Sequence, residues 1–248
     1  MKHFHKIFCL LLAAALMLLT LSACGGSGDG KTVVVATSPD YPPFEDMDGE
    51  KIVGIEPELV ELIAQKLGIT VQWESVDYNS IITGVEAGRY DVGAAAISIT
   101  PERQKNCDFT QPYFLAAQTI VVLPGSDIHG KDDLAGKTIA VQTGTTAESY
   151  CMENDYTVLS FDSSNDAAAA LSAGKADAWV VDNEVAVAVS QKLGLVMLDE
   201  AMTSEPFAFA FAKGSELTAQ FDAALAELLA DGSVQKLFDK YDALYVAP

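Results

Sequence analysis

Short apolar runs alternate with amphipathic stretches along the first half of the chain. "TVVVAT" at 32–37 is rich in β-branched residues, which predicts a buried strand. The stretch 56–68 carries its leucines and isoleucine on one helical face and ends at a glycine, which predicts a helix with a glycine cap. Residues 70–76 alternate as a strand does, 79–88 read as a helix, and "YDVGAAAISI" at 90–99 is expected as the next strand. This alternation predicts βαβ units and a largely parallel sheet.

The second half repeats the same order of elements. We expect a strand at 137–142, a turn that opens a helix at 143–154, and then a helix, a turn and a strand within 165–186. "VEAGRYDVGAAAIS" and "LSAGKADAWVVDN" each read as a helix ending in Ala-Gly, followed by a basic residue, a spacer, an aspartate and an apolar strand. The likeness predicts two related lobes.

The C-terminal part supplies a further strand, an amphipathic helix at 216–232 and the short helix "SVQKLFDKYDAL". These elements are expected to pack back against the first half, so that the chain crosses twice between the lobes. The crossings are placed near 116–119 and 205–209, as a two-strand hinge. The expected boundaries are 32–116 with 208–248 for the first lobe, and 117–207 for the second lobe with the hinge strands.

The first 23 residues read as an export signal. A basic start, "MKHFHK", precedes an apolar run at 7–21 that is short for a bilayer, although an uncleaved membrane anchor is the alternative. "LSAC" then resembles a bacterial lipobox, which implies that Cys24 carries a lipid and becomes the new N-terminus. Residues 24–31 suit a flexible tether. The resemblance implies a protein anchored by its lipid to the outer face of the bacterial cytoplasmic membrane.

The balance of charges excludes some partners. The chain has 15 basic and 35 acidic residues and a formal net charge of −20 at pH 7. Such a surface is repelled by phosphate backbones and by anionic lipid headgroups. We therefore expect no nucleic-acid partner, and contact with the membrane only through the lipid.

Histidine and cysteine usage excludes much chemistry. His3 and His5 fall in the signal, so only His129 remains, inside the loop-like "PGSDIHGKDD". No Ser-His-Asp set, CxxC, HExxH or calcium-loop spacing is present, so we expect no catalytic residue, no metal and no cofactor. The spacing of Cys107 and Cys151 allows a disulfide in an oxidising compartment, but we favour free, buried thiols.

A scarce arginine stands where an apolar stretch gives way to a helix start. In "SITPER", Thr100 is expected to cap a helix that begins at Pro101, with Arg103 in its first turn. Free N–H groups at a helix start favour an anion, and a guanidinium grips a carboxylate bidentately. The alternative is a surface arginine paired with Glu102 or Asp108.

The stretch "GIEPELVELIAQKLG" at 54–68 resembles the solute-binding proteins of polar amino-acid ABC importers. The family pattern is a glycine, an apolar or aromatic residue, an acid, an apolar position, an acid and a leucine, and only Pro57 departs from it. The resemblance continues through "YPPFE", "ISITPER", "QTGTTAE", "DNEVA" and "FAKGSEL", from residue 31 to about 243. It implies an α/β, two-lobed fold of the periplasmic-binding-protein type II, in which each lobe is a mostly parallel sheet flanked by helices.

The resemblance also implies roles for residues near the two termini of a bound amino acid. Arg103 is expected on the ligand's α-carboxylate, with further contacts from Ser98 and the Ala96 carbonyl. Asp182 is expected on the α-ammonium; the alternative is a cap for the helix that follows it, and both roles could coexist. Because the two charges of one zwitterion need groups from both lobes, the ligand binds the closed state better than the open one.

Other expected contacts come from both lobes. Thr145 and Thr146, at a helix start, are expected to meet the carboxylate from the second lobe. Tyr41 and Tyr78 match aromatic positions that sandwich the side chain, with ordinary core packing as the alternative.

A few positions bear on which ligand side chain is preferred. Ser38 stands where many relatives that bind basic side chains have an acid, and Gln142 suggests polar contacts. Asp40 and Glu45 lie nearby in the sequence but could be surface groups. The ligand is therefore expected to be a polar amino acid with an uncharged or basic side chain.

The function implied is that of a monomeric, non-enzymatic receptor. It would bind a free L-amino acid between two closing lobes and deliver it to an ABC permease. Two alternatives remain open: a ligand-sensing module for a signalling partner, and a dehydratase-like enzyme on the same fold.

Overall fold

The computed structural model describes residues 31–248. The expected signal peptide, Cys24 and the tether up to residue 30 lie outside the described residues. Thr32–Pro248 forms one compact unit. All the described sheets, helices and hydrophobic cores fall inside this unit, so the segment holds what it needs to fold by itself.

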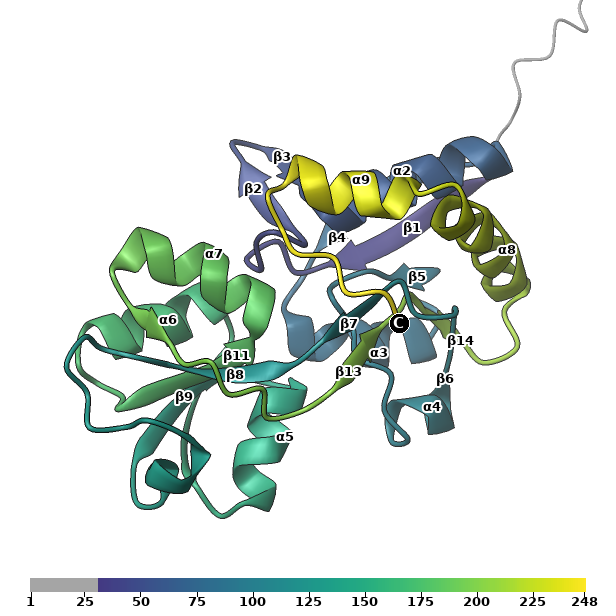
Figure 1. Ribbon diagram of the computed structural model, residues 1–248. Helices are drawn as coiled ribbons and strands as arrows, with labels where there is room; N and C mark the ends of the chain where they lie inside the picture. Colours follow the sequence, from purple (N-terminus) through teal and green to yellow (C-terminus); the bar gives the residue numbers. More distant parts are fainter. Residues whose placement is uncertain (1–30) are drawn as a thin grey trace, which may run out of the picture. The chain divides into compact units, whose positions relative to one another are not determined.

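The first lobe is built on a five-stranded sheet (Figure 1). Its strands, in spatial order, are β4 (Thr70–Ser75), β1 (Thr32–Thr37), β5 (Val92–Gly93), β14 (Ala210–Ala212) and β6 (Cys107–Phe109). β1 runs parallel to β4 and β5, whereas β14 runs antiparallel between β5 and β6. The last strand to join this sheet therefore comes from the C-terminal part of the chain, as expected.

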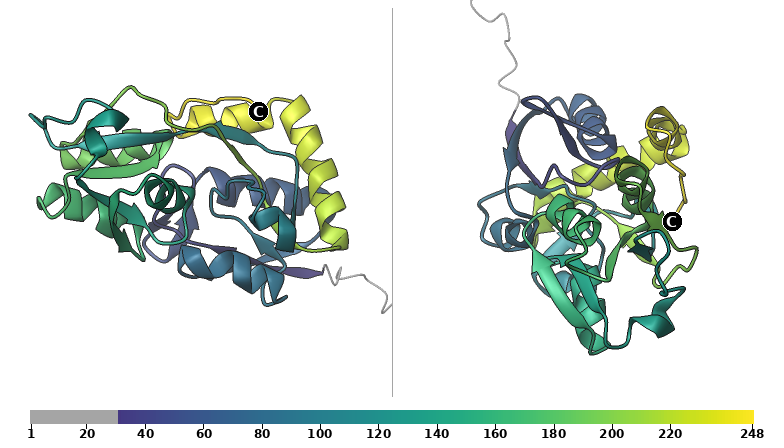
Figure 2. Two further views of the ribbon diagram at one scale, coloured as in Figure 1. Left: turned by 90° about the horizontal axis from the view of Figure 1, so that it is seen from below. Right: turned by 90° about the vertical axis from the view of Figure 1, so that its left-hand side faces the viewer.

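Helices and one hairpin cover this sheet. They are α2 (Ile55–Leu67), α3 (Tyr78–Glu86), α4 (Arg103–Asn106), α8 (Glu216–Ala230), α9 (Ser233–Lys240) and the hairpin of β2 (Asp46–Asp48) with β3 (Lys51–Val53). α2 buries one face and ends at Gly68 in the left-handed conformation, as its pattern predicts. α8 lies at the end of the first lobe that is far from the second lobe (Figure 2, left).

The second lobe repeats the plan with a second five-stranded sheet. Its order is β10 (Thr157–Phe161), β9 (Thr138–Gln142), β11 (Ala178–Asp182), β8 (Gln118–Val122) and β12 (Val196–Met197). β9 is parallel to β10 and β11, and β8 runs antiparallel between β11 and β12. The elements packed around it are η1 (Lys131–Leu134), α5 (Thr146–Glu153), α6 (Ser164–Ser172) and α7 (Asn183–Leu193).

A two-stranded antiparallel ribbon joins the lobes. It consists of β7 (Phe114–Ala116) and β13 (Glu205–Phe207). In each lobe, the strand that follows the ribbon, β8 or β14, is the one that enters its sheet antiparallel. The two-lobed α/β fold with a two-strand hinge is thereby confirmed, while the exact lobe boundaries stay a prediction.

Two local expectations differ from the structure. Of the strand expected at 90–99, only Val92–Gly93 pairs in the sheet, because the chain turns at Ala96, whose φ of 47° breaks an extended run. The helix expected to begin at Pro101 is the single turn α4, which begins at Arg103. Thr100 still acts as expected at this turn, since its hydroxyl accepts the Arg103 N–H at 3.1 Å.

The two cysteines of the described residues do not pair. Cys107 lies in β6 of the first lobe and Cys151 in α5 of the second, and both are free and buried. The expectation of free thiols is confirmed. Within residues 31–248, no helix has the length and apolar character to cross a bilayer.

Candidate functional site

Nine of the ten ligand-binding residues expected from the sequence line one cavity between the lobes. The first lobe contributes Ser38, Tyr41, Tyr78, Ala96 and Ser98, and the second contributes Gln142, Thr145, Thr146 and Asp182. The tenth, Arg103, lines a wider cleft beside the cavity, which Ser98 and Thr146 also border. The inner cavity is narrow, with room for about one water molecule. An amino acid can therefore enter only when the lobes separate.

Asp182 is a buried acid on the second lobe's side of the cavity. It ends β11 and is 4% exposed. One carboxylate oxygen accepts the Tyr41 hydroxyl at 2.5 Å, and the other accepts Gln118 Nε2 at 2.9 Å. Asp182 stands at the N-cap position of α7, as the alternative expected, but its side chain makes no capping hydrogen bond and is directed to Tyr41 and Gln118 instead. Burial, followed by the nearby charge of Glu205, raises the pKa of Asp182 well above its ordinary value. A cationic group beside this carboxyl would offset the cost of keeping it ionised.

Arg103 spans the mouth of the cavity. Its guanidinium donates to the Ser98 carbonyl at 2.9 Å, to the Tyr78 hydroxyl at 3.0 Å and to the Gly144 carbonyl at 3.1 Å. The guanidinium carbon also lies 5.7 Å from the centre of the Tyr78 ring, within cation–π range. Gly144 belongs to the second lobe, so Arg103 reaches across the cleft from the first.

The surface alternative for Arg103 is wrong. Glu102 pairs with Lys105, and Asp108 pairs with Lys213 at 2.8 Å. Both carboxylates thus have their own lysine. The guanidinium faces the cleft instead, where an anionic group can exchange with the carbonyl acceptors that it now contacts.

The hydroxyls that face the cleft converge on an acid that sequence reasoning placed only on the hinge. Glu205, 7% exposed on β13, accepts Ser98 Oγ and Thr146 Oγ1, each at 2.6 Å, and Thr203 Oγ1 at 2.9 Å. Ser98 is on the first lobe and Thr146 on the second. An isolated acid beginning the apolar stretch "EPFAF" was the only signal in the sequence. Glu205 is therefore a site residue that the sequence analysis missed, as is Gln118.

The turn before α5 is shaped for close approach of the lobes. Thr145 caps the helix, since its hydroxyl accepts the Glu148 N–H at 3.2 Å and donates to the Gln142 carbonyl at 2.7 Å. Gly144 has a φ of 80°, and a Cβ there would lie 2.9 Å from the Cβ of Asn79 in α3. Only glycine allows both this backbone conformation and this contact between lobes.

Asp40 forms a further bond across the cleft. Its carboxylate accepts the Ser164 N–H at the start of α6 at 2.7 Å and the Ser38 hydroxyl at 3.1 Å. Burial raises its pKa above the ordinary value, against the effect of these hydrogen bonds. Asp40 lines the cavity and is not a surface group.

Glu45 is likewise a cavity residue and is fully buried. It sits where the 41–45 turn packs against the start of α2, close to Glu56. Gly54 permits this packing, because its φ is 134° and a Cβ would lie 2.2 Å from the Phe44 carbonyl oxygen. The expectation that Glu45 could be exposed is wrong, because tertiary packing encloses it.

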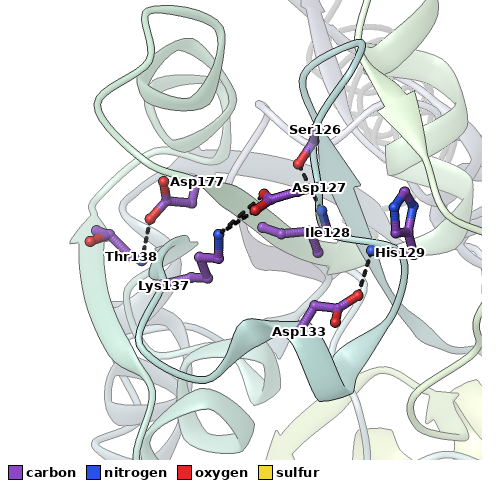
Figure 3. A network of polar contacts seen from close by, with 8 residues as sticks. All are labelled: Ser126, Asp127, Ile128, His129, Asp133, Lys137, Thr138 and Asp177. Atoms are coloured by element: carbon purple, nitrogen blue, oxygen red, sulfur yellow. Dashed lines mark hydrogen bonds and ion pairs between the residues drawn. The ribbon is translucent and has the colours of Figure 1, made fainter.

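His129 belongs to a different part of the second lobe. It is exposed in the loop before η1, and its backbone N–H donates to Asp133 Oδ2 at 2.8 Å (Figure 3). A Lys137–Asp127 ion pair of 3.1 Å holds the same loop. These contacts within the loop account for its conformation. Within residues 31–248, no group of three or more metal-ligating side chains comes together.

Comparison with known proteins agrees with the geometry of the site. The family model of the bacterial extracellular solute-binding proteins, family 3, matches residues 33–243. The arginine-binding extracellular protein ArtP of Bacillus subtilis (strain 168) is 34% identical over 249 residues, covering 95% of this chain and 98% of that protein.

Two solved structures extend the comparison. An ancestral arginine-binding protein bound to arginine has a TM-score of 0.80 at 37% identity, over 85% of this chain and 97% of that one. The ancestral amino acid-binding protein AncCDT-1, a precursor of cyclohexadienyl dehydratase, has a TM-score of 0.79 at 33% identity, over 85% and 95%. These matches confirm the resemblance first read from 54–68. The chain belongs to the bacterial extracellular solute-binding proteins, family 3.

Proposed function

We propose that the protein binds a polar L-amino acid between its two lobes and delivers it to the permease of an ABC importer. One observation carries the proposal: a carboxylate and a guanidinium come from different lobes, with Asp182 on the wall of the inner cavity and Arg103 in the cleft beside it. An α-ammonium and an α-carboxylate on one carbon can satisfy both only when the lobes are closed. Binding then favours the closed state by the difference in affinity between the two states.

The side-chain end of the cavity favours a cationic ligand. Asp40 and Glu45 line it together with the polar groups of Ser38 and Gln142. Buried carboxyls stabilise a cation that enters beside them, and the aromatic faces of Tyr41 and Tyr78 can hold its aliphatic stem. Relatives named for binding arginine support the same class. We therefore propose an L-amino acid with a basic side chain as the preferred ligand.

The experiment is a thermal-shift panel of the twenty amino acids with the segment 31–248. A ligand present at 100 times its dissociation constant stabilises the folded state by roughly 2.7 kcal/mol, which is a clear rise in Tm. We expect the largest shifts from basic amino acids. A flat panel would contradict amino-acid binding, and a shift from neutral residues alone would contradict the basic class.

Anchoring is tested separately. We propose that Cys24 carries the lipid and holds the protein, as a monomer, on the outer face of the membrane. The full chain grown with labelled palmitate should take up label and fractionate with membranes. Cys24→Ser should lose both, while Cys107→Ser and Cys151→Ser serve as matched controls, since both of these thiols are buried in the folded unit.

The two alternative functions give different results. A dehydratase-like enzyme on this fold, the fate of the AncCDT-1 lineage, would consume its ligand during prolonged incubation with catalytic amounts of protein. A sensing module would bind its ligand without supporting uptake by any permease. Uptake of the labelled amino acid that depends on this protein supports the importer role over both.

A further inference from the structure

Two carboxyl groups meet beside the side-chain end of the cavity. Glu45 and Glu56 are both 0% exposed and lie close enough to interact directly. Each oxygen of Glu56 has a donor, the Ala96 N–H at 3.1 Å and the Tyr113 hydroxyl at 2.5 Å. Neither oxygen of Glu45 has one within residues 31–248. Glu45 is thus a fully buried carboxyl on the cavity wall whose polar atoms lack partners.

A proton shared between Glu45 and Glu56 accounts for the missing donor at Glu45. Two ionised carboxylates side by side in the core would repel each other and lack solvation, whereas one proton between them supplies the missing donor. The other charged groups acting on Glu45 are Asp40, from the loop after β1, and Asp182, from β11, and both are acids. The positive charge of Arg103 acts instead on Asp182 and Tyr78.

Burial supports retention of the proton near neutral pH. It raises the pKa of Glu56 to about 7 and that of Glu45 well above its ordinary value. Tyr113 opposes the shift of Glu56 by donating to it. The burial of both carboxyls, and the absence of any other donor to Glu45 within residues 31–248, therefore favour a protonated pair in the free protein.

We infer that a cationic ligand side chain replaces this proton, so that binding of a basic amino acid ionises Glu45 and releases a proton to solvent. The inference rests on the proposed ligand class. The O–H bond of the shared carboxyl breaks, its electron pair stays on the carboxylate, and the proton passes to water or buffer. The N–H groups of the ligand then donate to the Glu45 oxygens. A protonated carboxyl offers a cation only a dipole, whereas the carboxylate offers a full charge.

The consequence is a dependence of selectivity on pH. Across the range in which the free pair is protonated and the complex is not, affinity for a basic amino acid rises with pH, by at most tenfold per unit for one proton. It levels off above the pKa of the free pair. A ligand with a neutral side chain leaves the proton in place, so its affinity stays flat. Glu45 and Glu56 thus act together as a specificity device that favours basic ligands more strongly as pH rises.

The test is titration calorimetry of the segment 31–248 with L-arginine and L-glutamine. At pH 6, each titration is repeated in two buffers with different enthalpies of ionisation, which gives the number of protons released. We expect close to one proton for arginine and none for glutamine. Affinities between pH 5.5 and 8.5 should rise for arginine alone.

Substitutions test the contribution of the Glu45–Glu56 pair apart from that of the rest of the site. Glu45→Gln should abolish proton release and weaken arginine at least tenfold at pH 8, while changing glutamine affinity less than threefold. In Glu56→Gln the amide oxygen can accept the Ala96 N–H, while the amide NH2, in place of the oxygen that faces Tyr113, can donate to the Tyr113 oxygen and to Glu45, so arginine should bind with its pH slope lost. Glu86→Gln, an exposed acid on α3, should behave as the unmodified protein.

The measured results separate failure of the inference from failure of the proposed function. Tight arginine binding at pH 6 without proton release overturns the inference, as does a pH slope that survives in Glu45→Gln. If glutamine binds and no basic amino acid does, the inference fails while amino-acid binding stands. If none of the twenty amino acids binds, the proposed function itself fails.

Discussion

The hydroxyl of Tyr41, in the loop after β1, donates to the carboxylate of Asp182, at the end of β11, over 2.5 Å. The two residues are 141 positions apart and belong to different lobes, so this bond closes the cavity. Together with Gln118, Tyr41 also orients the carboxylate before any ligand arrives. An entering ammonium group would thus meet an acceptor whose position is already set.

Replacing Asp182 should remove most of the affinity for amino acids. Asp182→Ala leaves the ligand's ammonium buried without its counter-charge, which costs about 2–5 kcal/mol of binding free energy. Isothermal titration measures the loss. Asp166→Ala removes an exposed acid from α6 of the same lobe and should bind normally. Normal binding by Asp182→Ala would show that the ammonium lies elsewhere.

Arg103 should prove equally important for a different reason. Arg103→Ala removes the bidentate partner proposed for the ligand's carboxylate, with an expected loss of about 2–5 kcal/mol. Arg103→Lys should recover only part of it, because an ammonium lacks the planar fork. Arg89→Ala, at an exposed position, is the matched control. Equal affinities for the Arg89 and Arg103 variants would refute the assigned role.

The unliganded protein should become less stable as pH rises from 5 to 8. Burial raises the folded-state pKa of Glu56 from 4.5 to about 7. The folded state therefore binds more protons than the unfolded state in that window, and the free energy of unfolding falls with increasing pH. Glu56 alone accounts for a fall of up to roughly 3 kcal/mol, at about 1.4 kcal/mol per pKa unit.

Urea unfolding of the segment 31–248 at several pH values measures this slope. Glu56→Gln, which cannot ionise, should make the slope shallower, and the other buried acids with raised pKa values, such as Asp182, should account for the rest. Acids with lowered pKa values, such as Asp108 beside Lys213, lose their stabilising effect only as pH falls below their unfolded pKa of about 3.8 and leave this window unaffected. A slope that is the same in Glu56→Gln would mean that Glu56 is already ionised throughout this window.

A methyl group at Gly144 should weaken ligand binding by obstructing closure. Its Cβ would lie 2.9 Å from the Cβ of Asn79 on the opposite lobe, in a backbone conformation with φ of 80°. Gly174 has a φ of 68° and no atom within 4 Å of an added Cβ. Gly144→Ala and Gly174→Ala should therefore share a similar backbone cost of about 1 kcal/mol in stability. Only the first should also lower affinity and shift scattering toward a more open form. Equal affinities would show that the clash is relieved without opening.

Local pattern was enough to predict the main alternation of strands and helices and much of the cavity wall, but not several short strands such as β10 and β12. Strands and helices bury their apolar positions with their own periods, so runs such as 32–37 and 56–68 carry the signal in neighbouring residues. The hinge ribbon, at Phe114–Ala116 and Glu205–Phe207, lies next to the crossings expected near 116–119 and 205–209. Most of the expected binding residues reached the cavity because they stand at the ends of these strands or at the helix starts that follow.

What only the tertiary structure decided is which polar groups share a buried space. Ser98 and Glu205 are 107 positions apart, yet their hydrogen bond links a first-lobe loop to the hinge. Glu45 and Glu56 read as ordinary acids in the sequence, and only the packing permitted by Gly54 places them together out of water. Burial and pKa depend on atoms contributed by distant parts of the chain, so no local pattern could reveal them.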